Sequence, residues 1–170
     1  MAPPLNPPRI LRPRRLRAGH HGWLVLAALL SGLARADGPA AVPLLPAYQQ
    51  ECAACHLAYP PDLLPKASWQ RLMANLPRHF GTDASLDPAA TAALATWLDA
   101  HAGTYKKVQR EAAPPPQDRI TRAPWFQREH REIAAAVWQR PAVGSAANCA
   151  ACHSGAAQGR FNEHEVRVPR

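Results

Sequence analysis

The sequence predicts a mostly α-helical protein in two parts, each carrying one Cys-x-x-Cys-His motif. Apolar residues recur at helical spacing in several short stretches, and prolines or glycines end these stretches. No stretch has the clear alternation of a strand. A proline-rich run from Ala112 to Pro116 stands between the two motifs, so each part is expected to hold its own motif.

Each helix is predicted from its own start and stop signals. Asp87 followed by Pro88 is a strong helix start, because an N-cap precedes proline at the first helical position. Ser68 is an expected N-cap, and Ser145 is expected to cap a short helix that carries the second motif. The predicted helices lie at about residues 44–56, from Ser68 to Pro77, from Pro88 to Gly103, from Pro124 to Pro141 and after Ser145.

Residues 1–36 have the features of a secretory signal peptide. They combine five arginines between residues 9 and 17, an apolar run from Trp23 to Leu33, and Ala34-Arg35-Ala36 as the cleavage site. The run is shorter than the roughly 20 apolar residues that a membrane-spanning helix needs. We expect general secretion, cleavage after Ala36 and no transmembrane span in the mature chain, with an uncleaved anchor as the alternative.

The strongly basic character of the chain comes mostly from this leader. Six of the 20 basic residues and none of the 12 acidic ones lie in residues 1–36, which leaves 14 basic residues and a net charge near +2. The isoelectric point of 10.0 for the whole chain is therefore no argument for binding nucleic acid, and we expect no nucleic-acid partner.

The two motifs predict covalent haem attachment. They are Cys52-Ala53-Ala54-Cys55-His56 and Cys149-Ala150-Ala151-Cys152-His153. At this spacing two thiols add to the haem vinyl groups and the histidine supplies an imidazole to the iron. A redox disulfide is expected after a strand of a thioredoxin-like fold, and paired zinc knuckles lie closer than these motifs, which are 97 residues apart. We therefore expect two haem c groups, held by Cys52, Cys55, His56, Cys149, Cys152 and His153.

The residue on the far side of each iron is less certain from spacing. His79 lies in a loop between two helices, 23 residues after His56, where small class I cytochromes c place their distal ligand. His101 shares a helix face with Leu94 and Trp97 and stays a rival. Met73 stands among leucines and is expected to pack in the core.

For the second iron, His130 is the first candidate. It lies 23 residues before His153 and shares its predicted helix face with Ile133, Ala134 and Val137. His164 follows the second motif by 11 residues, and its flanking glutamates suggest a solvated side chain, so it is the alternative.

Several longer stretches resemble the bacterial dihaem cytochrome c family. They include CAACHLAYPPDLLP at 52–65, SWQRLM at 68–73, RHFGTDASL at 78–86, WFQREHREI at 125–133 and NCAACH at 148–153. The resemblance extends to GRF at 159–161 and VPR at 168–170, and it covers nearly all of residues 45–170.

This resemblance implies a fold, a ligand set and partners. It implies a class I cytochrome c-like N-terminal domain and a small, irregular α-helical second haem domain. The divisions would be a signal peptide at 1–36, haem domains at 37–103 and 120–170, and a linker at 104–119. It also implies bis-histidine iron in both domains, pairing His56 with His79 and His153 with His130. Family members are thought to pass electrons to a small oxygen-binding monohaem cytochrome c or to work with a membrane cytochrome b.

We therefore expect an electron carrier of the bacterial periplasm and not an enzyme. The alternatives are a dihaem peroxidase-like enzyme and a gas-binding haem protein, each of which needs one open iron. The chain is short for such a peroxidase, and no acid or base is evidently placed over an open iron.

Overall fold

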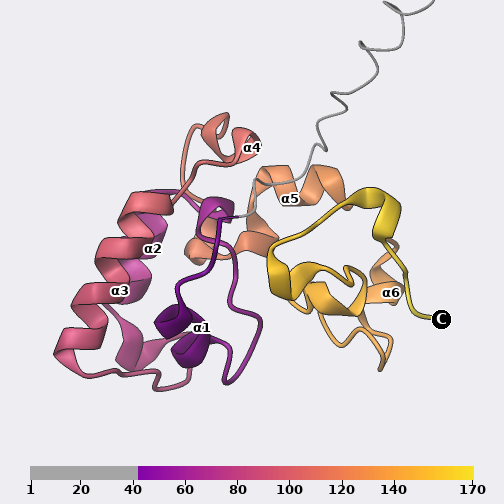
Figure 1. The fold of residues 1–170 in the computed structure, drawn as a ribbon. Coiled ribbons are helices and arrows are strands. Elements are labelled where there is room, and N and C mark those ends of the chain that lie inside the picture. Colours follow the sequence, from indigo (N-terminus) through magenta and orange to yellow (C-terminus); the bar gives the residue numbers. More distant parts are fainter. Residues whose placement is uncertain (1–41) are drawn as a thin grey trace, which may run out of the picture. The chain divides into compact units, whose positions relative to one another are not determined.

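The computed structural model describes residues 42–170, which belong to one compact unit (Figure 1). The predicted signal peptide lies outside the described residues. Within 42–170 the regular structure is helical, and the only β-type pairings are isolated bridges between His79 and Thr82 and between His153 and Val166. The predicted mostly α-helical fold is therefore confirmed. None of the described helices has both the length and the apolar character that crossing a membrane requires.

The first three helices pack around one apolar core. They are α1 (Pro46–Cys52), α2 (Lys66–Met73) and α3 (Pro88–His101), and α3 contacts both of the others. Asp87 caps α3 as predicted, because its carboxylate accepts hydrogen bonds from the backbone N–H groups of Ala89 and Ala90 at 2.9 Å. Tyr48, Trp69, Leu94 and Leu98 are buried between these helices.

The predicted N-cap of α2 is wrong. The helix begins at Lys66, with Pro65 in the extended conformation before it, so Ser68 lies inside the first turn. The fixed φ of proline suits the residue at a helix start. The Ser68 N–H already donates to the Pro65 carbonyl at 2.9 Å, and its side chain is buried.

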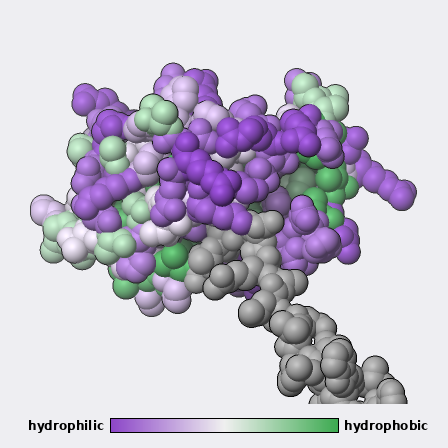
Figure 2. Space-filling view, turned by 90° about the horizontal axis from the view of Figure 1, so that it is seen from above, coloured by the Kyte–Doolittle hydropathy of each residue, from purple (hydrophilic) through white to green (hydrophobic). Residues whose placement is uncertain are grey.

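Residues 104–119 are more structured than expected. They contain a helix that the sequence did not predict, α4 (Lys106–Gln109). The side chain of Val108 within this helix is buried, and so is that of Tyr105 just before it. Ion pairs tie this region to α5 (Pro124–Glu129): Lys107 to Glu129 at 2.5 Å and Arg128 to Glu111 at 2.7 Å. The face of the molecule shown in Figure 2 is mostly hydrophilic. The predicted division into two domains around this segment stays a prediction.

The predicted helix from Pro124 to Pro141 is broken in two. It splits into α5 and α6 (Ala135–Trp138), because the backbone leaves the helical conformation at His130 and is extended at Ala134. The apolar side chains after His130 consequently do not share one helix face. The break lies beside a cavity described below, and His130 and Ile133 line that cavity.

The second motif lies on a single 3-10 turn, Cys149–Ala151, and not on the predicted α-helix after Ser145. The C-terminal tail runs beside it, since the N–H of Arg167 donates to the Cys152 carbonyl at 2.9 Å. Arg140 fixes the end of this tail by donating to the Pro169 carbonyl at 2.6 Å. The other 3-10 turns are Pro61–Leu63, Leu76–Arg78, Pro116–Asp118, Ile120–Arg122, Ala156–Gln158 and Glu163–Glu165.

Candidate haem sites

The first motif begins where α1 ends. Cys52 is the last residue of α1 and is half-buried, whereas Cys55 and His56 lie exposed in the turns that follow. Nδ1 of His56 donates to the carbonyl oxygen of Leu57 at 2.6 Å. This bond orients the ring and leaves Nε2 as the nitrogen available to a metal.

A tight turn presents His79 to His56. The Thr82 N–H donates to the His79 carbonyl at 3.0 Å, and the central residues Phe80 and Gly81 have φ values of +50° and +95°. Positive φ at both central residues is typical of a type I′ turn. The ring centroids of His56 and His79 lie 6.1 Å apart, with the planes inclined by 22°. We call these two residues the first imidazole pair.

This separation matches that of two imidazoles on opposite sides of one metal ion. A metal–nitrogen bond of about 2 Å on each side, with each ring centre about 1 Å further out, places the centroids about 6 Å apart. Burial, with smaller contributions from His56 and Arg119, lowers the pKa of His79, so this imidazole is neutral at pH 7. A neutral ring has the lone pair that coordination needs.

The second motif has a matching partner from α5. The ring centroids of His130 and His153 lie 6.2 Å apart, with planes inclined by 76°, and we call these residues the second imidazole pair. His130 ends α5, and its Nδ1 donates to the Phe126 carbonyl at 2.9 Å. Burial, followed by the effect of His130, lowers the pKa of His153, which therefore is also a neutral imidazole at pH 7.

A cavity of about 360 Å³ opens beside the second pair. Aromatic and aliphatic side chains form much of its wall, and the lining residues are Phe126, Gln127, His130, Arg131, Ile133, Trp138 and Ala146. Buried Nδ1 atoms of His79 and His153 have no hydrogen-bond partner within residues 42–170. Buried polar atoms are normally satisfied, so each of these Nδ1 atoms is left to water or a bound molecule. The paired imidazoles, together with the rings of Phe126 and Trp138 beside the second pair, fit haem.

The four cysteines form no disulfide with one another in the described chain. Burial raises the pKa of Cys52 and of Cys149 to about 11. Redox-active Cys-x-x-Cys motifs have the opposite property, because their nucleophilic cysteine has a lowered pKa. The electrostatics therefore argue against the dithiol–disulfide interpretation of these motifs.

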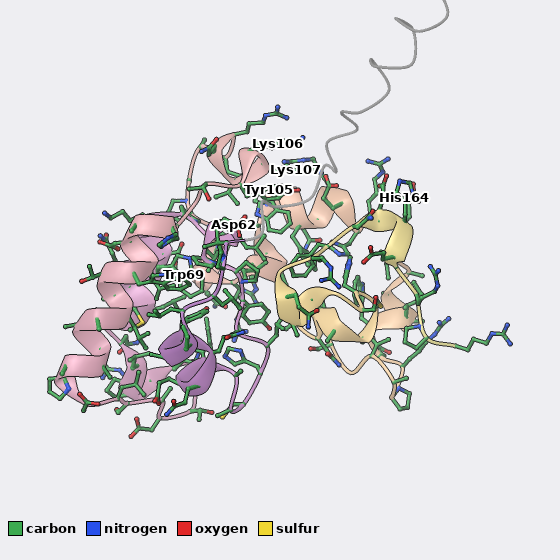
Figure 3. All side chains as sticks on the ribbon, in the orientation of Figure 1. Asp62, Trp69, Tyr105, Lys106, Lys107 and His164 are labelled. Carbon is green, nitrogen blue, oxygen red and sulfur yellow. The ribbon has the colours of Figure 1, made fainter. Side chains whose placement is uncertain are left out.

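The rival ligands lie elsewhere. Nδ1 of His101 is 2.8 Å from the Trp97 carbonyl oxygen, and its ring contacts the Trp97 ring. Met73 packs against the buried core, as expected. His164 is highly exposed at the outer side of the C-terminal tail (Figure 3).

Sequence reasoning missed two aromatic neighbours of the motif histidines. The Tyr59 ring lies against His56 with a centroid distance of 5.1 Å, and the Phe161 ring lies 5.4 Å from that of His153. Tyr59 is three residues beyond His56, a helical spacing that could have suggested proximity. Phe161 is brought to His153 by the fold of the tail, and no local signal marks it.

Comparisons with known proteins show the family to which the chain belongs. Residues 48–161 match the family described as dihaem cytochrome c. A dihaem cytochrome c from Rhodobacter sphaeroides is 42% identical, with a TM-score of 0.64 over 72% of this chain and 100% of that one. A dihaem cytochrome c from Shewanella baltica OS155 is 40% identical, with a TM-score of 0.64 over 75% of this chain and 95% of that one.

A second structure of the Rhodobacter sphaeroides protein is 40% identical, with a TM-score of 0.60 over 71% of this chain and 100% of that one. No curated protein matches the chain. The family match covers more than half of the chain and includes both motifs. The chain therefore belongs to the dihaem cytochrome c family, whose cofactors are two c-type haems.

Proposed function

We propose that this protein is a periplasmic electron carrier in which one haem iron is held by His56 and His79 and the other by His153 and His130. One observation carries the proposal: each motif histidine faces a second imidazole at almost the same distance. The ring centroids lie 6.1 Å apart for His56 and the neutral His79, and 6.2 Å apart for His153 and the half-buried His130. The cysteines Cys52, Cys55, Cys149 and Cys152 would bind the two haems through thioethers.

The bound haems would supply a one-electron iron couple, and the residues of the chain would do the rest. With two imidazoles on each iron, no position would be left for a substrate, and the same ligands would stay bound in both oxidation states. No side chain would have to leave or gain a proton when the charge on the metal changes. The aromatic walls, such as those of Phe126 and Trp138, would keep water from the second site.

The partners and the location rest on other support. The signal-peptide pattern of residues 1–36 favours export to the periplasm, where c-type haem is attached. The family resemblance favours a small oxygen-binding monohaem cytochrome c as electron acceptor, or a membrane cytochrome b as a redox partner. Docking between redox proteins is usually weak and uses small interfaces. Mixing each candidate with the reduced protein and timing its reduction tests these partners.

A peroxidase-like or gas-binding function is less well supported, because each needs an iron with an open position. The test is carbon monoxide added to the reduced, fully haem-loaded protein. We expect no rapid change in the optical spectrum. Rapid binding of carbon monoxide at either haem would refute the proposed bis-histidine carrier.

The ligand assignment is tested by alanine variants of the distal histidines. His79→Ala and His130→Ala should each turn one haem high-spin while its covalent attachment, measured by mass, remains. His101→Ala and His164→Ala are matched controls and should keep both haems low-spin. If a control variant gives the high-spin spectrum and its counterpart does not, the assignment is wrong at that site.

A further inference from the structure

Tyr59 contacts the first haem-binding motif and the residue that lies two positions before the second one. Its ring lies against the His56 imidazole, with centroids 5.1 Å apart and planes inclined by only 26°. Its hydroxyl donates to the carbonyl oxygen of Ala147 at 2.7 Å, a bond between residues 88 positions apart in the chain. The two halves of the protein are thus joined at this side chain.

Ala147 leads directly into the second motif. Its carbonyl oxygen also accepts the backbone N–H of Cys149 at 3.0 Å, and the sulfur of Cys149 lies 3.7 Å away. One oxygen atom therefore receives both the Tyr59 hydroxyl and the first cysteine of the second motif. A continuous series of short contacts runs from the imidazole of His56 through Tyr59 and Ala147 to Cys149.

The backbone of Tyr59 is held in place by its neighbours. The hydroxyl of Tyr48, a core residue, donates to the Tyr59 backbone carbonyl at 2.7 Å, and Pro60 beside it is buried.

We propose that Tyr59 is the positioning residue that couples the two haem sites for electron transfer between them. The inference rests on the proposed function, because it requires the two irons to be redox centres. A single electron passes between them, so that one iron is oxidised as the other is reduced. No covalent bond forms or breaks and no proton moves. Tyr59 keeps its oxidation state, and its contribution is a bonded, closely packed route between the two motifs.

The competing explanation is that Tyr59 only holds the two halves together. Two variants and one control separate these roles. Tyr59→Phe keeps the ring against His56 and removes the hydrogen bond, and Tyr59→Leu removes both contacts. Thr96→Val is the matched control, since it loses a hydroxyl-to-carbonyl bond of similar length, the 2.9 Å bond to Ala92, within α3 alone.

The measurement is the rate of electron equilibration between the haems after one electron is injected by a light pulse into the oxidised, haem-loaded protein. Reduction potentials and low-spin spectra are recorded for every variant. We expect a severalfold slower rate in Tyr59→Phe, a slower one still in Tyr59→Leu, and an unchanged rate in Thr96→Val, with low-spin spectra throughout.

An unchanged rate in Tyr59→Phe would overturn the inference, as would an equal slowing in Thr96→Val, which would mean that general loosening causes the effect. If Tyr59→Leu fails to fold, the comparison between Tyr59→Phe and Thr96→Val decides. A failure of the proposed function is visible separately, because the unaltered protein would then bind carbon monoxide or have a high-spin haem.

Discussion

A buried carboxyl group in the N-terminal half sets an unusual dependence of stability on pH. Asp62 lies in the 3-10 turn before α2, close to Trp69 in the interior (Figure 3). It has no exposed surface, and neither carboxylate oxygen has a hydrogen-bond partner in the described part of the chain. Burial raises the pKa of Asp62 to about 6, although its own backbone N–H nearby acts in the opposite direction. The perturbation that tests this is Asp62→Asn, which keeps the shape and removes the charge.

The sign and size of the effect follow from the pKa. In the unfolded chain the pKa of an aspartate is about 3.9, so between about pH 4 and pH 6 the unfolded protein loses a proton that the folded protein keeps. The contribution of Asp62 to the free energy of unfolding is therefore most favourable below pH 4 and falls as the pH rises to about 6. Each pKa unit corresponds to about 1.4 kcal/mol, so a pKa difference of about 2 lowers the free energy of unfolding by about 3 kcal/mol.

The assay is denaturant unfolding of the haem-loaded protein at pH 4 and at pH 7. The free energy of unfolding of Asp62→Asn, relative to that of the unaltered protein, should be about 3 kcal/mol higher at pH 7 than at pH 4. Comparing the two pH values removes any constant cost of the amide. Glu132→Gln is the control, since this side chain is 87% exposed and should show no such difference. A difference between pH values that is the same for Asp62→Asn and Glu132→Gln would refute the reasoning.

Three further predictions concern the two sites and the helix that supports the first. The imidazole planes are nearly parallel in the first pair (22°) and nearly perpendicular in the second (76°), so the oxidised protein should give two distinct low-spin ferric signals in electron paramagnetic resonance, the second more anisotropic. Two identical signals would contradict this. Asp87→Ala removes the cap of α3 and should lower the free energy of unfolding by about 1 kcal/mol, measured by denaturant titration. Gly103→Ala should lower the free energy of unfolding by about 1–2 kcal/mol in the same measurement, because φ is +64° there and the new Cβ would lie 3.3 Å from the Cα of Pro65. An unchanged midpoint would show that the turn adapts.

The parts of the fold predicted from sequence are those with strong local signals. The start of α3 follows from Asp87 and Pro88 alone, since a side-chain cap and a fixed φ need no distant partner. The haem motifs are equally local. The pairing of His79 with His56 was implied by family resemblance, and spacing alone had left His101 as a rival.

The parts that were missed depend on distant contacts. Apolar periodicity from Pro124 to Pro141 predicted one helix, but periodicity does not show whether the apolar side chains meet a helix or a cofactor pocket. The chain breaks at His130, where the ring must turn toward His153. Helix α4 was missed because its four residues are too few for a periodic pattern, and its core contact comes from Val108.

The two sites have the same imidazole spacing but differ in which ring the protein anchors. In the first pair the motif histidine, His56, donates Nδ1 to a backbone carbonyl, whereas Nδ1 of His79 has no partner in the described chain. In the second pair the distal histidine, His130, has the carbonyl bond and the motif histidine, His153, has none. An Nδ1 hydrogen bond fixes ring orientation and raises ligand basicity. With iron bound as proposed, the second site would secure His130 by a hydrogen bond and His153 by the cysteine attachment beside it. The first site would secure His56 twice and would depend on the His79–Thr82 turn to hold His79, so His79 would be the more weakly held of the two distal ligands.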